Sequence, residues 1–354
     1  MAEFEPKKLL ILYILNILRE HTDPDHPISQ QKIVEHLESE YGMTADRKTV
    51  RRNLSKLMEA GYPIRFQGST MDSQEIRRIG RNGKEQTILT NWYYCHQFEY
   101  GELSLLIDSV LSVDGLSKRH RIELIQKIET LTSKHFQSVR KKIDMDIYGK
   151  LVNQQMIFTI ENIRQAIAKG RQLQFQYFDI GTDFKLHPRT ADSKPRIYTV
   201  NPYQIIARNG HQYLISHMEQ KEGLTHFRVD RIKNIEVLET PAKKLRELRG
   251  FENGLQLSEY VKAHPYLWSG EVRHITFRCK QYMMNDIADC FGTDLHIEPQ
   301  PDDMILVHVH ASEENVLLWA VQFADEVEVL SPQSLREQIA EKLRRAMDKY
   351  TNEQ

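Results

Sequence analysis

Cysteine is scarce in this sequence. Its three cysteines, Cys95, Cys279 and Cys290, lie far apart among 354 residues. Such spacing gives neither a paired metal-ligand motif nor a disulfide framework, so we expect no metal and a reducing, cytoplasmic environment. The apolar run at residues 9–15 is interrupted by Asn16, and no small-residue cleavage site follows it. We therefore expect neither a signal peptide nor a membrane span.

Motifs of common enzyme families are also lacking. The chain contains no Gly-rich phosphate loop, no Gly-x-Ser-x-Gly elbow and no His-Glu-x-x-His helix. His308 and His310 would share one face of a predicted strand, but no third metal ligand is evident near them. We therefore expect a binding protein without catalytic residues, cofactor or metal, in which these two histidines face solvent.

The chain has no overall excess of charge, because 48 Lys and Arg residues face 49 Asp and Glu residues. Positive charge is concentrated locally instead. Residues 44–56 hold five basic side chains and one acidic one, and residues 65–84 hold five basic and two acidic ones. Two basic segments in an otherwise neutral chain are typical of a phosphate-binding surface.

The first of these segments falls on the third of three predicted helices, which cover residues 7–20, about 30–41 and 46–60. Ser29 is an expected N-cap of the second helix, and Gly61 is expected to end the third. Two short helices joined by a tight turn indicate a helix-turn-helix, whose second helix enters the major groove of DNA. Its predicted DNA-binding residues are Arg47, Lys48, Thr49, Arg51, Arg52, Asn53 and Lys56.

The second basic segment is predicted to be the tip of a β-wing. Apolar runs at residues 62–66, 86–89 and 92–94 flank an arginine-rich stretch that contains the turn Asn82-Gly83. The wing tip, with Arg77, Arg78 and Arg81, would follow the DNA backbone or enter the minor groove. Helices followed by a wing make a winged helix. The alternative is that the basic helix is only a solvated, charged surface.

Two amphipathic helices are predicted next, over residues 102–111 and 118–131, and another over 160–168. They either complete the first domain or pair across a two-fold axis. We favour a homodimer, because one winged helix makes too few base contacts for useful specificity.

A β-rich region is predicted from residue 172 to 238. Several short strands, with a two-residue hairpin turn at Asn209-Gly210 and no long helix among them, favour a small closed barrel. The run 201–216 and the pattern Arg-x-Asp-Arg-Ile at 228–232 resemble the WYL domain of bacterial transcriptional regulators. The triplet that names this family reads Gln212-Tyr213-Leu214 here, so its tryptophan is missing.

The resemblance implies an Sm-like or SH3-like barrel that senses an anionic ligand, in some members a nucleotide or a nucleic-acid species. Two guanidinium groups beside an aromatic ring suit a phosphate that carries a stacking base. The alternative is that Asp230 pairs with a neighbouring arginine and the cluster only holds the barrel together. Carried over by position, the ligand-binding residues would be Tyr213, Arg228 and Arg231, with Arg208, His211 and Arg189 near them.

The C-terminal region is predicted to be ferredoxin-like. Its order is strand 272–279, helix 282–291, strands 294–298 and 304–310, helix 313–323 and strand 327–330, and a final helix covers 334–350. WYL regulators often end in such a region, called WCX, so the resemblance covers nearly the whole chain.

The whole sequence thus predicts a multidomain α+β protein. Its parts would be an all-α, winged-helix DNA-binding domain (1–95), a helical linker and dimerisation region (96–170), an Sm-like barrel (171–240) and a ferredoxin-like WCX domain (241–354). We expect a cytoplasmic, homodimeric transcriptional regulator that binds double-stranded operator DNA and an anionic effector and has no membrane partner. The alternative is a nucleic-acid binder of a DNA-repair or defence system that uses the barrel to hold single strands.

Overall fold

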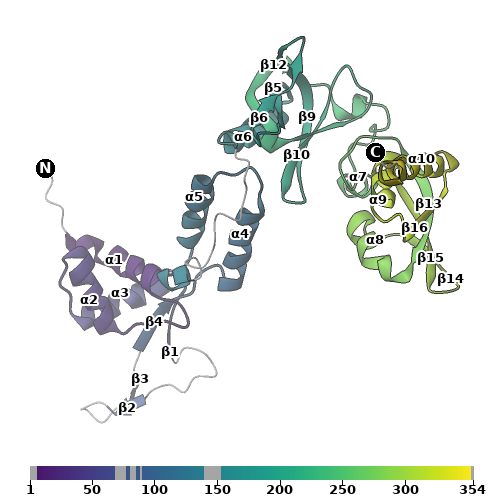
Figure 1. Cartoon of the computed structure of the whole chain (residues 1–354). Helices are drawn as coiled ribbons and strands as arrows, with labels where there is room; N and C mark the ends of the chain where they lie inside the picture. The colour runs from purple at the N-terminus through teal and green to yellow at the C-terminus, as the bar shows by residue number, and fades with distance from the viewer. Residues whose placement is uncertain (1–5, 68–76, 80–84, 88–89, 139–152, 352–354) are drawn as a thin grey trace. The chain divides into compact units, whose positions relative to one another are not determined.

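The computed structural model describes residues 6–67, 77–79, 85–87, 90–138 and 153–351 (Figure 1). The chain divides into two compact units, Met1–Val152 and Asn153–Gln354. It is a mixed α+β protein with several antiparallel sheets. Among the described residues, no helix has both the length and the apolar character needed to cross a bilayer.

The first unit is mainly helical. Its elements, in chain order, are α1 (Pro6–His21), α2 (Gln30–Tyr41), α3 (Arg47–Glu59), β1 (Ile64–Gln67), β2 (Arg77–Ile79), β3 (Glu85–Thr87), β4 (Thr90–Tyr94), α4 (Tyr100–Ser112), α5 (Lys118–Glu129) and the 3-10 helix η1 (Lys134–Ser138). These bounds confirm the predicted helices to within a few residues. The strands β1 and β4 pair antiparallel, and β2 pairs with β3.

Capping side chains fix where α2 and α3 begin. Ser29 accepts a hydrogen bond from the backbone N–H of Lys32, and Asp46 accepts one from the N–H of Thr49. The apolar faces of α1, α2 and α3 meet in one core around Trp92 of β4. The helix α3 ends at Glu59 with Ala60 as its C-cap, and Gly61 takes the positive φ that turns the chain toward β1. The basic face of α3 is therefore held on a packed support.

A buried carboxylate joins α1 to the α4–α5 pair. The Oδ2 atom of Asp23 accepts hydrogen bonds from the hydroxyls of Tyr100 and Ser133, both at 2.6 Å. Its Oδ1 atom lies 2.8 Å from Nδ1 of His26 and accepts the backbone N–H of the same residue. Burial favours a raised pKa for Asp23, but the hydrogen bonds from Ser133, Tyr100 and His26 outweigh it and lower the pKa to about 2.

Acid should therefore weaken the first unit through Asp23. A carboxyl group whose folded pKa is depressed contributes stability that is fully present above its unfolded pKa, here 3.8, and is lost as pH falls through the folded value. The contribution is about 2 kcal/mol. We expect Asp23→Asn to remove this part of the pH dependence of the urea-unfolding free energy between about pH 4 and pH 2. Asp25→Asn, which removes a neighbouring but exposed carboxylate, should keep this pH dependence. Equal acid profiles for the two variants would contradict the assignment.

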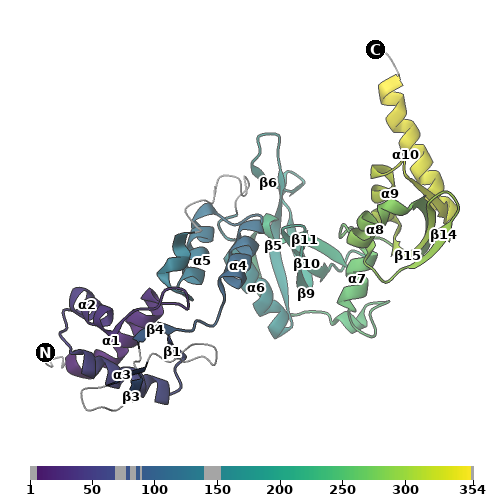
Figure 2. The same cartoon turned by 90° about the horizontal axis from the view of Figure 1, so that it is seen from below.

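The second unit starts with a helix and a curled sheet. Its elements as far as residue 270 are α6 (Met156–Lys169), β5 (Arg171–Ile180), β6 (Leu186–Pro188), β7 (Thr190–Ala191), β8 (Lys194–Pro195), β9 (Ile197–Arg208), β10 (His211–His217), β11 (Thr225–Arg228), the 3-10 turn η3 (Val229–Arg231), β12 (Ile232–Pro241), η4 (Leu245–Glu247) and α7 (Leu257–Ala263). The helix α6 packs on one face of the sheet through Ile163 and Ala166 (Figures 1 and 2). Asn209 and Gly210 both have positive φ at the β9–β10 turn, as the sequence predicts.

The expected closed barrel is not formed by the described strands. Their order is β11-β10-β9-β5-β12, with β6 beside β5, and β11 and β12 are not paired with each other. Only the three residues of η3 connect these two edge strands, so the sheet must curl to bring its edges near one another. Alternating residues predict strands and their faces, but closure depends on whether the last two edges exchange hydrogen bonds.

A segment after β12 packs back on this sheet. Leu248 and Leu267 share an apolar core with Ile206, Ile215 and Leu224 of the sheet region. The hydroxyl of Ser269 donates a hydrogen bond to the carbonyl of Leu224 at 2.8 Å. The short helix α7 in this segment was not predicted from the sequence, because its seven residues show too little helical periodicity. The segment supplies walls to both pockets described below.

The rest of the second unit is a four-stranded sheet with helices on one face. Its elements are β13 (Val272–Lys280), η5 (Gln281–Met283), α8 (Met284–Phe291), β14 (His296–Gln300), β15 (Met304–Ser312), α9 (Glu313–Gln322), β16 (Val327–Ser331) and α10 (Gln333–Thr351). The strand order β14-β15-β13-β16, all antiparallel, is that of the predicted split βαβ pattern. Phe277, Phe291 and Trp319 form the centre of its core.

Candidate DNA-binding and effector sites

The helix α3 presents its cations to solvent. Val50, Leu54 and Leu57 are buried against α1 and α2, which turns the opposite side of the helix outward. Five basic side chains of α3 are exposed, and within the described part of the chain none has a carboxylate at ion-pair distance; they are Arg47, Lys48, Arg51, Arg52 and Lys56. A helix face of unpaired cations attracts an anion rather than stabilising its own fold.

Two predicted DNA-binding residues are engaged within the helix itself. The hydroxyl of Thr49 lies 3.3 Å from Oδ2 of Asp46, whose other oxygen caps the helix. The side-chain amide of Asn53 donates a hydrogen bond to the carbonyl of Thr49 at 2.9 Å. Both side chains would have to exchange these bonds to reach a base. The predicted wing residues Arg77 and Arg78 lie on β2, whereas Arg81 lies outside the described residues.

The second site is a pocket of about 650 Å³ at the side of the curled sheet. It lies between strands of the sheet and the segment 266–269 that packs on them. Its walls are Tyr177, Arg189, Arg196, Tyr198, Tyr213, Met218, Lys221, Thr225, His226, Phe227, Arg228, Tyr266, Leu267, Trp268 and Ser269. This lining contains four cations and several aromatic rings, and no described Asp or Glu belongs to it. We call it the basic pocket.

Two of the four cations have fixed partners just behind the wall. The guanidinium of Arg228 forms two hydrogen bonds to buried Asp230, at 3.1 and 2.7 Å. Arg189 does the same with Asp179, at 2.6 and 3.0 Å, and lies 4.8 Å over the ring of Tyr177. Hydrogen bonds to Asp179 raise the pKa of Arg189 further above its usual value. These bonds fix the two guanidinium groups in place while leaving them at the wall of the pocket.

The other two cations supply its net positive charge. Arg196 and Lys221 are exposed, and neither has a carboxylate partner among the described residues. The guanidinium of Arg196 lies 4.8 Å over the ring of Tyr198, a cation–π contact that leaves its charge available. His226, also in the wall, adds no charge near neutral pH, because burial and the nearby His264 lower its pKa to about 4.

Only part of the predicted effector set comes together in this pocket. Tyr213, Arg228 and Arg189 line it, and Tyr213 is the direct cross-strand partner of Arg228. Arg231 is not in the lining and lies 3.7 Å from Asp179. Arg208 and His211 flank the β9–β10 turn and do not line the pocket either.

Arg196 and Lys221, which belong to other parts of the curled sheet, were not predicted as pocket residues. For Arg196, the available signal was its position as a basic residue just before an apolar strand. The missing tryptophan does not alter the pocket wall. Side chains alternate along a strand, so Gln212 points to the face opposite Tyr213 and is not in the lining.

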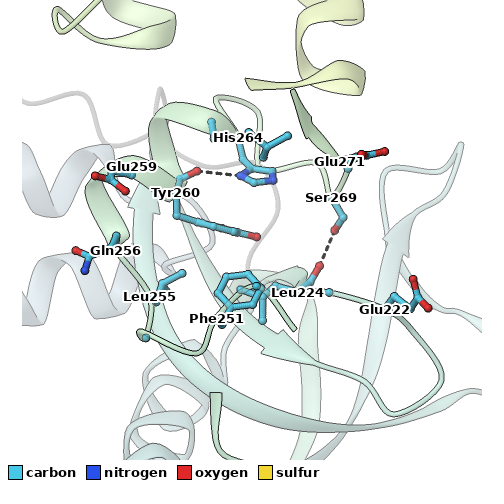
Figure 3. Close-up of a pocket in the computed structure, with 16 residues that line it drawn as sticks. Glu222, Leu224, Phe251, Leu255, Gln256, Glu259, Tyr260, His264, Ser269 and Glu271 are labelled. Carbon is cyan, nitrogen blue, oxygen red and sulfur yellow. Dashed lines mark hydrogen bonds between the residues drawn. The ribbon is translucent and has the colours of Figure 1, made fainter. Parts of the chain in front are cut away.

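A second pocket, drawn in Figure 3, shares Ser269 with the first and has the opposite charge character. It measures about 680 Å³ and is lined by residues 222–224, 250–264 in part and 269–272. Three residues with carboxylates, Glu222, Glu259 and Glu271, line it, and no described Lys or Arg does. The hydroxyl of Tyr260 in this wall lies 3.0 Å from Nε2 of His226 in the wall of the basic pocket. Charge therefore directs an anion to the basic pocket and away from its neighbour.

Comparison with protein families agrees with this architecture. Residues 159–237 match the WYL domain and residues 271–347 match the WCX domain. The chain therefore carries a WYL domain followed by a WCX domain, which confirms the resemblance drawn from the sequence. The WYL match includes most of α6, consistent with the packing of this helix on the sheet.

The chain is also similar to individual proteins. It is 21% identical over 300 residues to the "Uncharacterized HTH-type transcriptional regulator YobV" of Bacillus subtilis (strain 168), covering 83% of this chain and 86% of that protein. Among solved structures, it overlays with proteasome accessory factor B/C (PafBC) of Arthrobacter aurescens at 16% identity and a TM-score of 0.27, over 97% of this chain and 49% of the other. It thus spans about half the length of that chain. A CRISPR Cas-related protein gives 12% identity and a TM-score of 0.37, over 97% and 84% of the two chains. TM-scores this low support no conclusion about function.

Proposed function

We propose that this protein is a cytoplasmic, DNA-binding transcriptional regulator whose response is set by an anionic effector in the basic pocket. The observation that carries the proposal is the exposed basic face of α3, whose cations have no carboxylate partners among the described residues. Support also comes from the WYL and WCX domains and from the similarity to a protein named as an HTH-type regulator. No enzymatic activity is part of the proposal.

In this proposal the N-terminal elements act as a winged helix. The helix α3 is the recognition helix, and the β1–β4 pair with the β2–β3 pair is the wing. Arg51 and Arg52 lie on the exposed side of α3, where guanidinium groups can form bidentate bonds to guanine. Lys56, near the C-terminal end of the helix, is better placed for a phosphate.

The curled sheet holds the effector in the basic pocket. Arg189, Arg196, Lys221 and Arg228 would bind phosphate oxygens, and Tyr213 or another wall ring would stack on a base. This combination of four cations with aromatic rings favours a nucleotide or a short single strand over a small inorganic anion. An inorganic anion would leave the aromatic part of the wall without a partner.

A homodimer is the expected state of this regulator. The helix α4 exposes neighbouring leucines, with Leu105 at 68% and Leu106 at 39% of full exposure. A second copy of α4 would cover this apolar surface and place two recognition helices on one DNA molecule.

We expect a dimer that protects a discrete operator. Sedimentation should give twice the chain mass of 41.7 kDa in the absence of DNA, and footprinting should show two inverted half-sites about one or more helical turns apart. Leu105→Glu should convert the dimer to a monomer, whereas Leu12→Glu, at an exposed leucine of α1, should not.

Mapping bound DNA in the native host would then identify the target genes. Binding that only grows with the length of single strands, without a discrete site, would instead favour the nucleic-acid binder of a repair or defence system.

A further inference from the structure

Four histidines gather on one face of the C-terminal sheet. His274 is on β13, His296 on β14, and His308 and His310 on β15. In the strand register, His308 is opposite His296, and His310 is opposite His274. Side chains alternate along each strand, so all four lie on the face opposite the apolar core.

A carboxylate completes a set of three metal-ligand atoms within this group. Oε1 of Glu298 lies 3.0 Å from Nε2 of His296 and 3.5 Å from Nε2 of His308. All three ligand atoms lie within 4.8 Å of one another. In a tetrahedral zinc site with bonds of about 2.1 Å, ligand atoms lie about 3.4 Å apart. Small side-chain movements would therefore bring these three atoms to coordination geometry.

The most enclosed of the three ligands is already oriented. The Nδ1 atom of His308 lies 3.2 Å from the hydroxyl of Thr276 on β13. Its Nε2 atom is shielded from solvent and forms no hydrogen bond with any described residue. A ligating histidine normally has its other ring nitrogen held by a hydrogen bond in this way, which fixes its tautomer and its direction.

We propose that His296, Glu298 and His308 bind a divalent metal ion of the zinc class. Two imidazoles and one carboxylate favour Zn²⁺ over Mg²⁺ or Ca²⁺, which prefer oxygen ligands. The fourth position is open to water or to His274, whose ring centre lies 5.4 Å from that of His308. The third ligand could not be seen in the sequence, because Glu298 and His308 lie on different strands. Only the register of β14 against β15 brings them together.

Two other groups of histidines and carboxylates, both in the first unit, are less suited to a metal. In the group around His21, the ammonium of Lys134 lies 3.5 Å from Nε2 of that histidine and would repel a cation. In the group around Asp23, the carboxylate already accepts hydrogen bonds from Tyr100 and Ser133. Among the described residues, neither obstacle is found at the group on the C-terminal sheet.

The test is zinc binding by the metal-free, full-length chain, measured by equilibrium dialysis and calorimetry. We expect His308→Ala and Glu298→Gln to bind one equivalent of Zn²⁺ less than the wild type. His310→Ala is the matched control, because it removes a histidine from the same face of the same strand and should keep the full stoichiometry. Thr276→Val should weaken this site by about 10-fold to 100-fold through the lost orientation of His308.

A spectroscopic measurement separates coordination from a change in folding. Co²⁺ in place of Zn²⁺ should give the intense visible bands of a tetrahedral complex in the wild type and in His310→Ala. His308→Ala should lose these bands while its circular dichroism stays that of the wild type. Equal zinc stoichiometry in the wild type, His308→Ala and Glu298→Gln would overturn the proposal.

Discussion

Replacing both Arg51 and Arg52 with alanine should abolish specific operator binding while leaving the protein folded. Both side chains are exposed on α3 and contribute nothing to the core formed by Val50, Leu54 and Leu57. Each bidentate contact to a base is worth about 1–3 kcal/mol, so the double variant should lose about 2–6 kcal/mol of specific binding, a factor of roughly 30 to 10⁴. The measurement is operator affinity by fluorescence anisotropy over a series of salt concentrations.

The matched control is the double variant Arg344→Ala and Arg345→Ala. These are also adjacent, exposed arginines on a helix, α10, and both pair with Glu341. The control should bind the operator like the wild type. If Arg51 or Arg52 contacts a phosphate rather than a base, the loss should be similar for all DNA sequences and the slope of affinity against salt should flatten. Unchanged affinity and salt slope in the α3 variant would mean that another surface binds DNA.

The α3 surface could be predicted from the sequence because its signals are local. Asp46 caps the helix within one turn, the apolar residues of α3 recur at helical spacing, and Gly61 follows its end. The order of strands and helices in the C-terminal region could likewise be predicted from alternating residues along the chain, whereas the strand register, which brings Glu298 beside His308, could not. Which cations on α3 lack partners was not predictable in this way, because that depends on what the rest of the fold places beside them.

The lining of the basic pocket could be predicted from the sequence only in part. Tyr213 and Arg228 were found through a family pattern and do meet in the pocket. Arg196 and Lys221 come from two different connections of the sheet, and the wall near Trp268 comes from a segment beyond it. Residues that are brought together by sheet curvature and by a returning segment have no regular spacing in the sequence that would reveal them. The missing pairing between β11 and β12 could not be predicted for the same reason, because closure of a sheet depends on all of its strands.

Removing Arg196 and Lys221 should uncouple DNA binding from the effector. These two side chains carry the unpaired positive charge of the basic pocket and make no ion pair within the described fold. An effector that binds one arrangement of the dimer more tightly than another shifts the population between them, and operator affinity changes by the same coupling energy. That coupling is typically about 1–3 kcal/mol, or roughly 5-fold to 150-fold in affinity. The double variant Arg196→Ala and Lys221→Ala should keep its operator affinity without effector and lose this change.

The two exposed cations make a cleaner test than Arg228 and Arg231. Arg228 is the bidentate partner of buried Asp230, so Arg228→Ala would leave a buried carboxylate without its partner. This should lower the unfolding free energy by about 3–5 kcal/mol. Loss of the effector response in Arg228→Ala together with Arg231→Ala is expected too, but it would be accompanied by a lower unfolding free energy. The double variant of Arg196 and Lys221 should unfold like the wild type.

The experiment is a titration of operator affinity with candidate nucleotides and short oligonucleotides, for the wild type and each variant. Lys185→Ala together with Lys194→Ala is the matched control, since both lysines are exposed near the same sheet but do not line the pocket. This control should respond like the wild type. A response that survives in Arg196→Ala and Lys221→Ala would exclude the basic pocket as the effector site. Weaker operator binding by that variant without any effector would mean that the pocket itself contacts DNA, and that the protein uses its sheet to hold nucleic acid.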